Sequence, residues 1–201
     1  IDFWNKYGID RATLRKCNVY AISHYFMNGT RFLAEKYAYV FVEKKEGTLS
    51  FKIYQPYSKI RKWINNNDYS VWELWSVIPR YGDNLIITSS RKDAMSIMST
   101  TGIPAVSLQS ENIIPKENVI RDICNRFKNV YLFYDNDINN EQNNGQIFSK
   151  KILIKYSELN IKNIKIKDIL SRKDYSDLVK DFGVEFSVNE LKEMIDEIKR
   201  S

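Results

Sequence analysis

From residue 84 onward, short apolar stretches alternate with segments of helical periodicity, and this alternation constrains the fold more than any other feature. Apolar runs predict strands at 85–88, 105–108, 130–134 and 161–166. Spaced apolar residues predict helices between them, the first beginning at the capping pattern Ser90-x-x-Asp93. A last helix is expected from Ser187, where Ser187-x-x-Glu190 repeats that pattern. Strands alternating with helices are typical of a parallel sheet flanked by helices.

Residues 1–83 have a different character. They carry 13 basic and 8 acidic residues and 18 of the 27 aromatic residues, whereas residues 84–201 carry 18 basic and 17 acidic residues. A helical lead-in is expected at 2–16, strands at 18–26, 38–42 and 49–54, and a boundary turn at 81–83. Interleaved cations and rings suit single-stranded nucleic acid, because cations follow phosphates and rings stack on bases. An aromatic core beneath a solvated basic surface explains the composition equally well.

The sequence therefore predicts an α/β protein in three parts: an α+β basic subdomain at 1–83, a parallel sheet with flanking helices at 84–182, and a C-terminal helix at 183–201. Cys17, Cys124 and His24 are too few to form a disulfide framework or a four-ligand zinc site. No apolar run approaches the roughly 18 residues of a membrane helix, so no membrane partner is expected. A reduced, cytoplasmic compartment fits this cysteine usage.

Acidic residues follow all four predicted strands. The carboxyl ends of parallel strands meet at one edge of a sheet, where ligands bind, so these side chains are expected to converge there. Carboxylates are the ligands that Mg²⁺ prefers, and Asp135 and Asp137 are expected to face one shared cleft. An Asp-x-Asp pattern also occurs in ordinary turns, and Asp93 is explained as a helix-start carboxylate. The acidic residues are Asp93, Glu111, Asp135, Asp137, Asp174 and Asp177.

The stretch 84–182 resembles the Toprim domain of bacterial and phage primases, of type IA and type II topoisomerases and of some nucleases. Residues 89–93 (Ser-Ser-Arg-Lys-Asp) stand where the family has Glu-Gly-x-x-Asp, and residues 135–137 match its Asp-x-Asp motif. Residues 173–177 (Lys-Asp-Tyr-Ser-Asp) match a later motif of primases, which favours that branch. Residues 1–83 are similar to the basic subdomain that precedes Toprim in phage primases.

The resemblance implies the RNA-polymerase core of a phage-type DNA primase, acting in the cytoplasm of a bacterial host. Such an enzyme makes short RNA primers on single-stranded DNA from ribonucleoside triphosphates, by nucleotidyl transfer that depends on Mg²⁺ or Mn²⁺. The resemblance implies metal ligands at Asp135, Asp137, Asp174 and Asp177, with Asp93 and Asp135 among the catalytic acids. A replicative helicase is an expected partner. The family's zinc ribbon and any helicase domain would lie outside this sequence, so no zinc is expected within it.

Two positions depart from the family pattern. Ser89 stands where the family has its catalytic Glu, and the Gly that follows Asp-x-Asp is displaced to Gly145 by an Asn-rich insertion. Glu111 is the candidate to replace the missing acid, because it should follow the strand next to the first one, although a solvated loop carboxylate is an equal alternative. A Toprim nuclease and a catalytically degenerate nucleic-acid-binding module therefore remain as alternative functions.

Basic and aromatic residues near both motif regions are candidates for contact with nucleotide or DNA. Trp63 is a candidate for stacking on a base, although a Trp is more often part of a core. The alternative for each cation is an ordinary solvated surface. The candidates for phosphate contact are Lys59, Arg61, Lys62, Arg91 and Lys92, and Lys52 is a further candidate for binding nucleotide or DNA.

Overall fold

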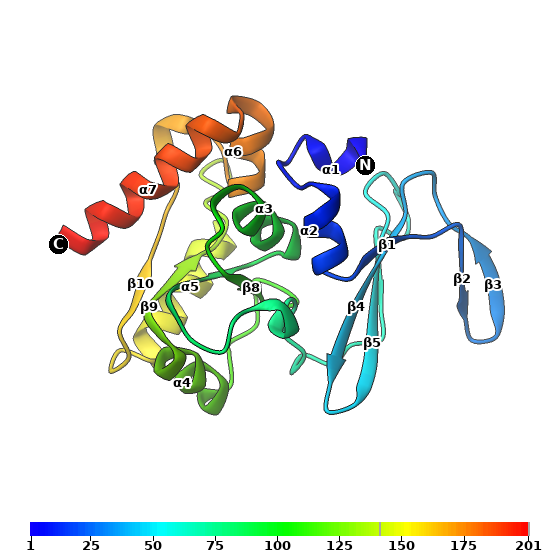
Figure 1. Ribbon diagram of the computed structural model, residues 1–201, viewed down its shortest axis with the longest axis horizontal. Helices are drawn as coiled ribbons and strands as arrows, with labels where there is room; N and C mark the ends of the chain where they lie inside the picture. The colour runs from blue at the N-terminus through cyan, green and yellow to red at the C-terminus, as the bar shows by residue number, and fades with distance from the viewer. Residues whose placement is uncertain (141, 201) are drawn as a thin grey trace.

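The computed structural model describes residues 1–140 and 142–200 and has the expected α/β architecture (Figure 1). The four strands expected after residue 84 form one parallel sheet in the order β10-β9-β7-β8. Thr88 pairs with both Ser107 and Phe133, so the carboxyl ends of the three neighbouring strands β8, β7 and β9 lie level. The strands are β7 (Gly82–Thr88), β8 (Ala105–Ser107), β9 (Phe127–Phe133) and β10 (Ile161–Asn163).

Helices cover both faces of this sheet. Alternate residues of β9 enter two different cores, since Tyr131 and Phe133 face one side and Val130 and Leu132 the other. The first side is covered by α3 (Arg91–Thr101), α6 (Tyr175–Phe182) and α7 (Val184–Arg200), and the second by α4 (Glu117–Arg126) and α5 (Asn144–Lys155). Two short 3-10 helices, η1 (Trp75–Val77) and η2 (Asp168–Leu170), lie in the connections.

The two capping predictions have different outcomes. Ser90 is the N-cap of α3 and accepts a hydrogen bond from the backbone N–H of Asp93, as expected. The prediction for Ser187 is wrong, because α7 begins three residues earlier, at Val184. Ser187 instead lies inside the helix, where its hydroxyl donates to the carbonyl of Gly183 at 2.7 Å. A serine bonded back to the preceding turn has the same sequence spacing as a cap.

The N-terminal half contains a second, antiparallel sheet in the order β1-β4-β5-β6. It follows the short helices α1 (Asp2–Asn5) and α2 (Arg11–Lys16) and consists of β1 (Val19–Ala21), β4 (Tyr39–Lys45), β5 (Thr48–Tyr54) and β6 (Trp63–Asn65). A turn at Glu46 and Gly47 joins β4 to β5 as an antiparallel hairpin. A separate hairpin of β2 (His24–Met27) and β3 (Thr30–Leu33) extends away from both sheets (Figure 1).

One hydrophobic core crosses the boundary expected at residue 83. Trp4 and Phe41 of the N-terminal half belong to the same buried cluster as Met95 and Ile97 of α3. A buried ion pair also crosses the boundary, since the Arg91 guanidinium contacts the Glu43 carboxylate of β4. The antiparallel half is therefore packed directly onto the first turns of α3.

Among the described residues, none of the helices combines the length and the apolar character that a membrane crossing requires.

Candidate metal and nucleotide site

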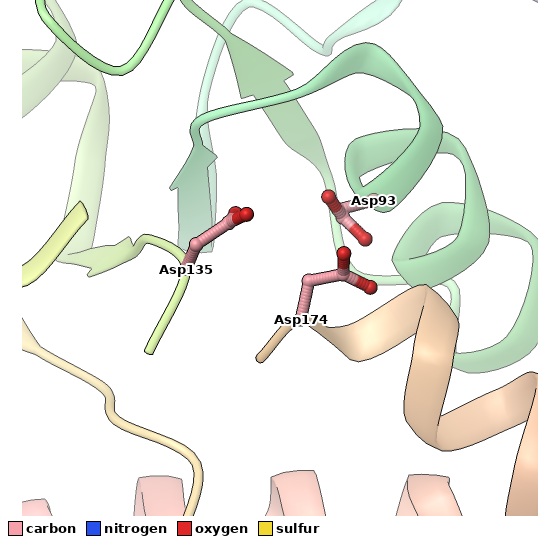
Figure 2. Close-up of side chains that lie close together, drawn as sticks. All are labelled: Asp93, Asp135 and Asp174. Atoms are coloured by element: carbon pink, nitrogen blue, oxygen red, sulfur yellow. The ribbon is translucent and has the colours of Figure 1, made fainter. Parts of the chain in front are cut away.

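Three aspartates converge beyond the carboxyl ends of the parallel strands. Asp93 comes from the first turn of α3, Asp135 from the loop after β9, and Asp174 from the residue before α6. One carboxylate oxygen of each lies within 4.8 Å of the others, and Figure 2 shows the three side chains pointing toward one another. An all-carboxylate donor set of this size fits a hard divalent cation such as Mg²⁺ or Mn²⁺.

Asp93 is held between the N-termini of two helices. It occupies the third position of α3, and its Oδ1 accepts from the backbone N–H of Ser176 in the first turn of α6 at 3.0 Å. Its Oδ2 accepts from the Ser90 hydroxyl. Asp93 is only 3% exposed, and burial raises the pKa of its carboxyl to about 7, with Asp174 and Asp135 adding to the shift and Lys92 opposing it. The side chain is therefore fixed before any cation binds.

Asp174 serves as the N-cap of α6. Its Oδ1 accepts from the backbone N–H of Asp177 at 2.7 Å and from the Ser176 hydroxyl at 2.8 Å. The bond from Asp177 satisfies an amide group that the helix leaves unpaired, and the positive end of the helix favours the carboxylate. The capping therefore directs the other oxygen, Oδ2, to a fixed position in the cluster.

Asp135 is oriented from two sides. Its Oδ1 accepts from the Ser89 hydroxyl at 2.5 Å, and its Oδ2 lies 3.2 Å from the Nζ of Lys173. Ser89, the residue that departs from the Toprim pattern, is thus directly bonded to the central acid. Asp135 is less buried than its two partners in the cluster, so it is the member nearest to solvent.

The backbone of Asp135 is supported by the displaced glycine. A Cβ at Gly145 would meet the Asp135 carbonyl oxygen at 2.3 Å, so only glycine lets α5 approach this closely. The side chain of Gln146 donates to the Asp135 carbonyl at 3.1 Å. Gly145 thus lies against the aspartate loop although ten positions separate it from Asp135 in the sequence.

Asn136, between the two acids of the Asp-x-Asp motif, is a buried hub of hydrogen bonds. Its backbone N–H donates to the carbonyl of Lys173 at 2.7 Å, and its side chain donates to Asp168 at 2.8 Å. The Asn143 side chain donates to the side-chain Oδ1 of Asn136 and accepts from the backbone N–H of Asp137. The Asn-rich insertion therefore contributes Asn143 to the support of the motif. Sequence reasoning missed Asn136 and Asn143, because asparagine in a loop resembles ordinary turn composition.

The other predicted acids lie around the cluster rather than in it. The pKa of Glu111 is raised by burial and by its proximity to Asp135, so this carboxylate lies within electrostatic reach of the cluster. Asp137 also raises the pKa of Glu111. Burial and Asp174 raise the pKa of Asp177. The expected neighbour relation holds, since Glu111 follows β8 and β8 pairs with β7. Glu111, Asp137 and Asp177 thus stay outside the group of three closest acids.

Two lysines face the carboxylates. Lys173 lies 3.2 Å from Asp135 and 3.9 Å from Asp174, measured from Nζ to the Oδ2 atoms. Burial lowers the pKa of Lys92, but Asp174 and Asp93 outweigh this effect and raise it above the ordinary value. The Lys92 ammonium lies 4.5 Å from the centre of the Tyr7 ring. Lys92 therefore faces the acids rather than open solvent.

Arg91 and Lys52 were expected to contact nucleotide or DNA, but the structure places both in the interior. Arg91 is 2% exposed and is bonded to Glu43 and to the carbonyl of Cys17. Lys52 pairs with the buried Glu73 at 3.1 Å and donates to the carbonyl of Gln109. Both cations are occupied by partners distant in sequence, so their placement does not fit a phosphate contact. Their observed role is to join the two halves of the chain.

The remaining candidates lie at the surface beside the edge strand β6. Lys59, Arg61 and Lys62 are exposed, and the Arg61 guanidinium lies 4.7 Å from the ring centre of Phe32 in the β2–β3 hairpin. Trp63 is 45% exposed and stacks on Tyr54 with ring centres 4.2 Å apart. One ring face of Trp63 is thus used within the protein. This surface retains the cation and aromatic mixture that single-stranded nucleic acid requires.

No protein-family model matches the chain, and no curated protein matches it by sequence. Solved structures match it closely in fold. The primase fragment of the bacteriophage T7 primase-helicase protein superimposes with a TM-score of 0.62 at 13% identity, covering 95% of this chain and 72% of the T7 fragment. The Aquifex aeolicus primase, comprising zinc-binding and RNA polymerase domains, gives a TM-score of 0.66 at 16% identity, covering 98% of this chain and 55% of that one.

The DnaG primase catalytic domain bound to single-stranded DNA gives a TM-score of 0.68 at 10% identity, covering 96% of this chain and 72% of that one. All three likenesses span nearly the whole chain, so they include the antiparallel half as well as the parallel sheet. The chain thus has the fold of the catalytic cores of bacterial and phage DNA primases.

Proposed function

We propose that this chain is the catalytic core of a DNA primase, which joins ribonucleotides into short primers on a single-stranded DNA template. The observation that carries the proposal is the aspartate cluster at the carboxyl edge of the parallel sheet, in a fold shared with primase cores. One structural neighbour is a primase catalytic domain bound to single-stranded DNA, and another belongs to a complex of a T7 DNA polymerase with primase domains, an RNA/DNA hybrid and dTTP. Nucleotidyl transfer on a template fits both the cluster and the basic surface.

In this proposal Asp93, Asp135 and Asp174 hold Mg²⁺ or Mn²⁺, and Asp137 and Asp177 complete the acidic surroundings. A bound divalent ion would neutralise the triphosphate and lower the pKa of the attacking 3′-hydroxyl. Glu111 accepts the proton of that hydroxyl, directly or through a water molecule, in place of the acid missing at Ser89. Burial and Asp135 raise the pKa of Glu111, which makes it a stronger base than a fully solvated carboxylate.

The antiparallel half supplies the template surface. Lys59, Arg61 and Lys62 contact phosphates, and the exposed part of the Trp63 ring stacks on a base. Lys92 contributes positive charge at the inner side of the acidic cluster, close to Tyr7. A replicative helicase is the proposed partner, in keeping with the T7 neighbour, which is part of a primase-helicase protein. A bacterial cytoplasm, as host of a phage-encoded protein, is the proposed location.

The test is extension of a ribodinucleotide on a complementary single-stranded DNA template, with labelled ribonucleotides and Mg²⁺ or Mn²⁺. A supplied dinucleotide provides the 3′-hydroxyl, so the assay does not depend on recognition of a start sequence. We expect template-dependent RNA products that disappear with chelator and in Asp135→Asn and Asp174→Asn. Loss of labelled DNA without RNA synthesis would instead identify a nuclease.

A degenerate nucleic-acid-binding module is the second candidate, and the Ser89–Asp135 hydrogen bond is the observation that favours it. A hydroxyl there can orient Asp135 but carries no charge of its own. This candidate would be supported if the chain binds single-stranded DNA but neither makes RNA nor degrades labelled DNA. The outcome of metal binding does not alter that conclusion.

A further inference from the structure

We propose that Lys173 is an internal counter-ion of the aspartate cluster and makes the site prefer a metal–triphosphate complex over a bare divalent cation. The proposal deepens the primase function and rests on it for the choice of nucleotide. Its starting point is the position of one ammonium group beside two carboxylates of the cluster.

The two oxygens of each carboxylate have separate partners. Oδ1 of Asp135 accepts from the Ser89 hydroxyl, and Oδ1 of Asp174 accepts from Ser176 and Asp177. Oδ2 of both residues faces the same group, the Nζ of Lys173, at 3.2 and 3.9 Å. The oxygens that protein groups leave for a cation are therefore the ones that Lys173 already contacts.

The position of Lys173 is set by its backbone, while its side chain has room to move. The Lys173 carbonyl accepts from the backbone N–H of Asn136 at 2.7 Å, which fixes the residue next to Asp135. The side chain is 48% exposed, so its ammonium can leave the carboxylates without unfolding the loop. Lys92, the other cation facing the acids, is more enclosed and lies over the Tyr7 ring. Lys173 is therefore the cation that can be displaced.

Displacement has a different cost for a bare cation and for a cation that carries a nucleotide. A bare divalent ion must break both Lys173 contacts and leaves an ammonium beside its own positive charge. A metal–triphosphate complex brings phosphate oxygens into the same place, and these accept the displaced ammonium in a charge-assisted hydrogen bond. Lys173 thus acts as a specificity-determining residue that opposes the metal alone and supports the metal with its substrate.

The experiment compares calorimetric titrations of the whole chain with Mn²⁺ alone and with Mn²⁺ plus a non-hydrolysable ribonucleoside triphosphate. Lys173→Met keeps the length of the side chain and removes its charge. Lys167→Met is the matched control, because Lys167 is similarly exposed but pairs with Glu190, Glu193 and Glu197 of α7. Circular dichroism of each variant verifies that it is folded.

We expect Lys173→Met to bind bare Mn²⁺ about tenfold more tightly than the parent. The gain is no larger because solvent screens the half-exposed Lys173 ammonium. The same variant should bind the nucleotide complex about tenfold more weakly, while Lys167→Met behaves as the parent in both titrations and Lys173→Arg stays close to it. An unchanged or weaker affinity for bare Mn²⁺ overturns the counter-ion role. Changes of the same sign in both titrations overturn the preference. Failure of the primase function would appear separately, as absence of RNA products from the parent chain.

Discussion

The two halves of the molecule use charge in opposite ways. In the parallel half, the functional candidates are buried or half-buried carboxylates, and hydrogen bonds from helix N-termini hold Asp93 and Asp174. In the antiparallel half, the candidates that remain available are exposed cations such as Lys59 and Lys62, whereas its most enclosed cation, Lys52, pairs within the protein. The carboxylate site therefore depends on exact geometry, and the basic surface depends on summed charge. Substitutions should consequently have large effects in the first region and graded effects in the second.

The largest expected effect is on activity, from Asp135→Asn. This change keeps the shape of the side chain and its acceptor for Ser89, but it removes the negative charge that attracts a divalent cation. We expect Mn²⁺ binding to be lost and nucleotide incorporation to fall by about 10² to 10³-fold, with the unfolding temperature unchanged or higher. Asp83→Asn, at an exposed carboxylate paired with Lys128, is the control and should match the parent. A parent-like Mn²⁺ titration of Asp135→Asn would contradict the metal assignment.

The next effect concerns stability at the junction of the halves. Arg91→Met should lower the free energy of unfolding by about 3–5 kcal/mol, because it leaves the Glu43 carboxylate buried without its cation. Burial already raises the pKa of Glu43, against the lowering effect of Arg91, and the variant should therefore be less destabilised at acidic pH. Urea unfolding at two pH values measures both effects. Arg121→Met, which removes an exposed cation with partners Glu117 and Glu158, should cost less than about 1 kcal/mol.

Gly145→Ala tests how closely the parallel half controls Asp135. The added Cβ would meet the Asp135 carbonyl oxygen at 2.3 Å, and backbone atoms cannot give way without moving α5 or the aspartate loop. We expect a loss of about 1–3 kcal/mol in stability and a weaker Mn²⁺ titration. Gly29→Ala, at an open position in the β2–β3 turn, changes backbone strain but should leave Mn²⁺ binding intact. Equal Mn²⁺ affinity in both variants would show that the close approach of Gly145 to Asp135 is not needed for metal binding.

The pH dependence of stability offers a smaller effect in the same region. The pKa of Asp93 is raised from 3.8 to about 7 by burial and by Asp174. The folded state thus binds this proton more tightly than the unfolded state, so metal-free stability should fall as pH rises between about 4 and 7. Asp93→Asn removes that titration. The free energy of unfolding, measured in chelator, should then differ less between pH 5 and pH 8 than it does in the parent. An unaltered difference would assign the dependence to other groups, such as Glu111 and Asp177.

The smallest expected effect lies in the basic surface. Lys62→Ala should weaken single-stranded DNA binding modestly and reduce the slope of log affinity against log salt by about one. Lys192→Ala, at an exposed position on α7, removes the same charge from the other half and should leave the slope unchanged. Fluorescence anisotropy at several salt concentrations measures the slopes. Identical slopes for the two variants would make the Lys62 surface an ordinary solvated one.

The sequence predicted the parallel half well because its strands are continuous apolar runs and its acids follow strand ends. Asp135 and Asp174 were singled out because they follow predicted strands, whereas position explained Asp93 as a helix-start carboxylate and the Toprim resemblance gave it a catalytic role. What the sequence could not reveal was which cations are enclosed. Arg91 follows a helix cap as Lys92 does, yet the partner of Arg91 is Glu43, 48 positions away along the chain. The spacing of nearby residues does not predict such a pair. For the same reason, the pair of Lys52 and Glu73 could not be predicted from the sequence.

Short or polar elements were also missed. The helix α6 was not predicted, because its motif residues were interpreted only as ligands, whereas Asp174 also serves as its N-cap. The strand β6 is three residues long, and β3 lies in a two-stranded hairpin, so neither has enough alternation to stand out. The folded environment, rather than local periodicity, determines these segments.

Asp93 and Asp174 belong to the candidate cation site and also accept hydrogen bonds from the first turn of α6, so this turn should respond to a ligand in the site. The amide of Ser176 donates to Asp93 and that of Asp177 to Asp174, so both amide protons are bonded to the carboxylates that would hold a cation. Any ligand that binds to those carboxylates changes the equilibrium between the closed and the open turn by thermodynamic linkage. The hydrogen–deuterium exchange rates of these two amides would therefore report whether a ligand occupies the site, without any need for catalysis. Exchange rates in the helices packed against this turn would show how far the effect of the ligand extends.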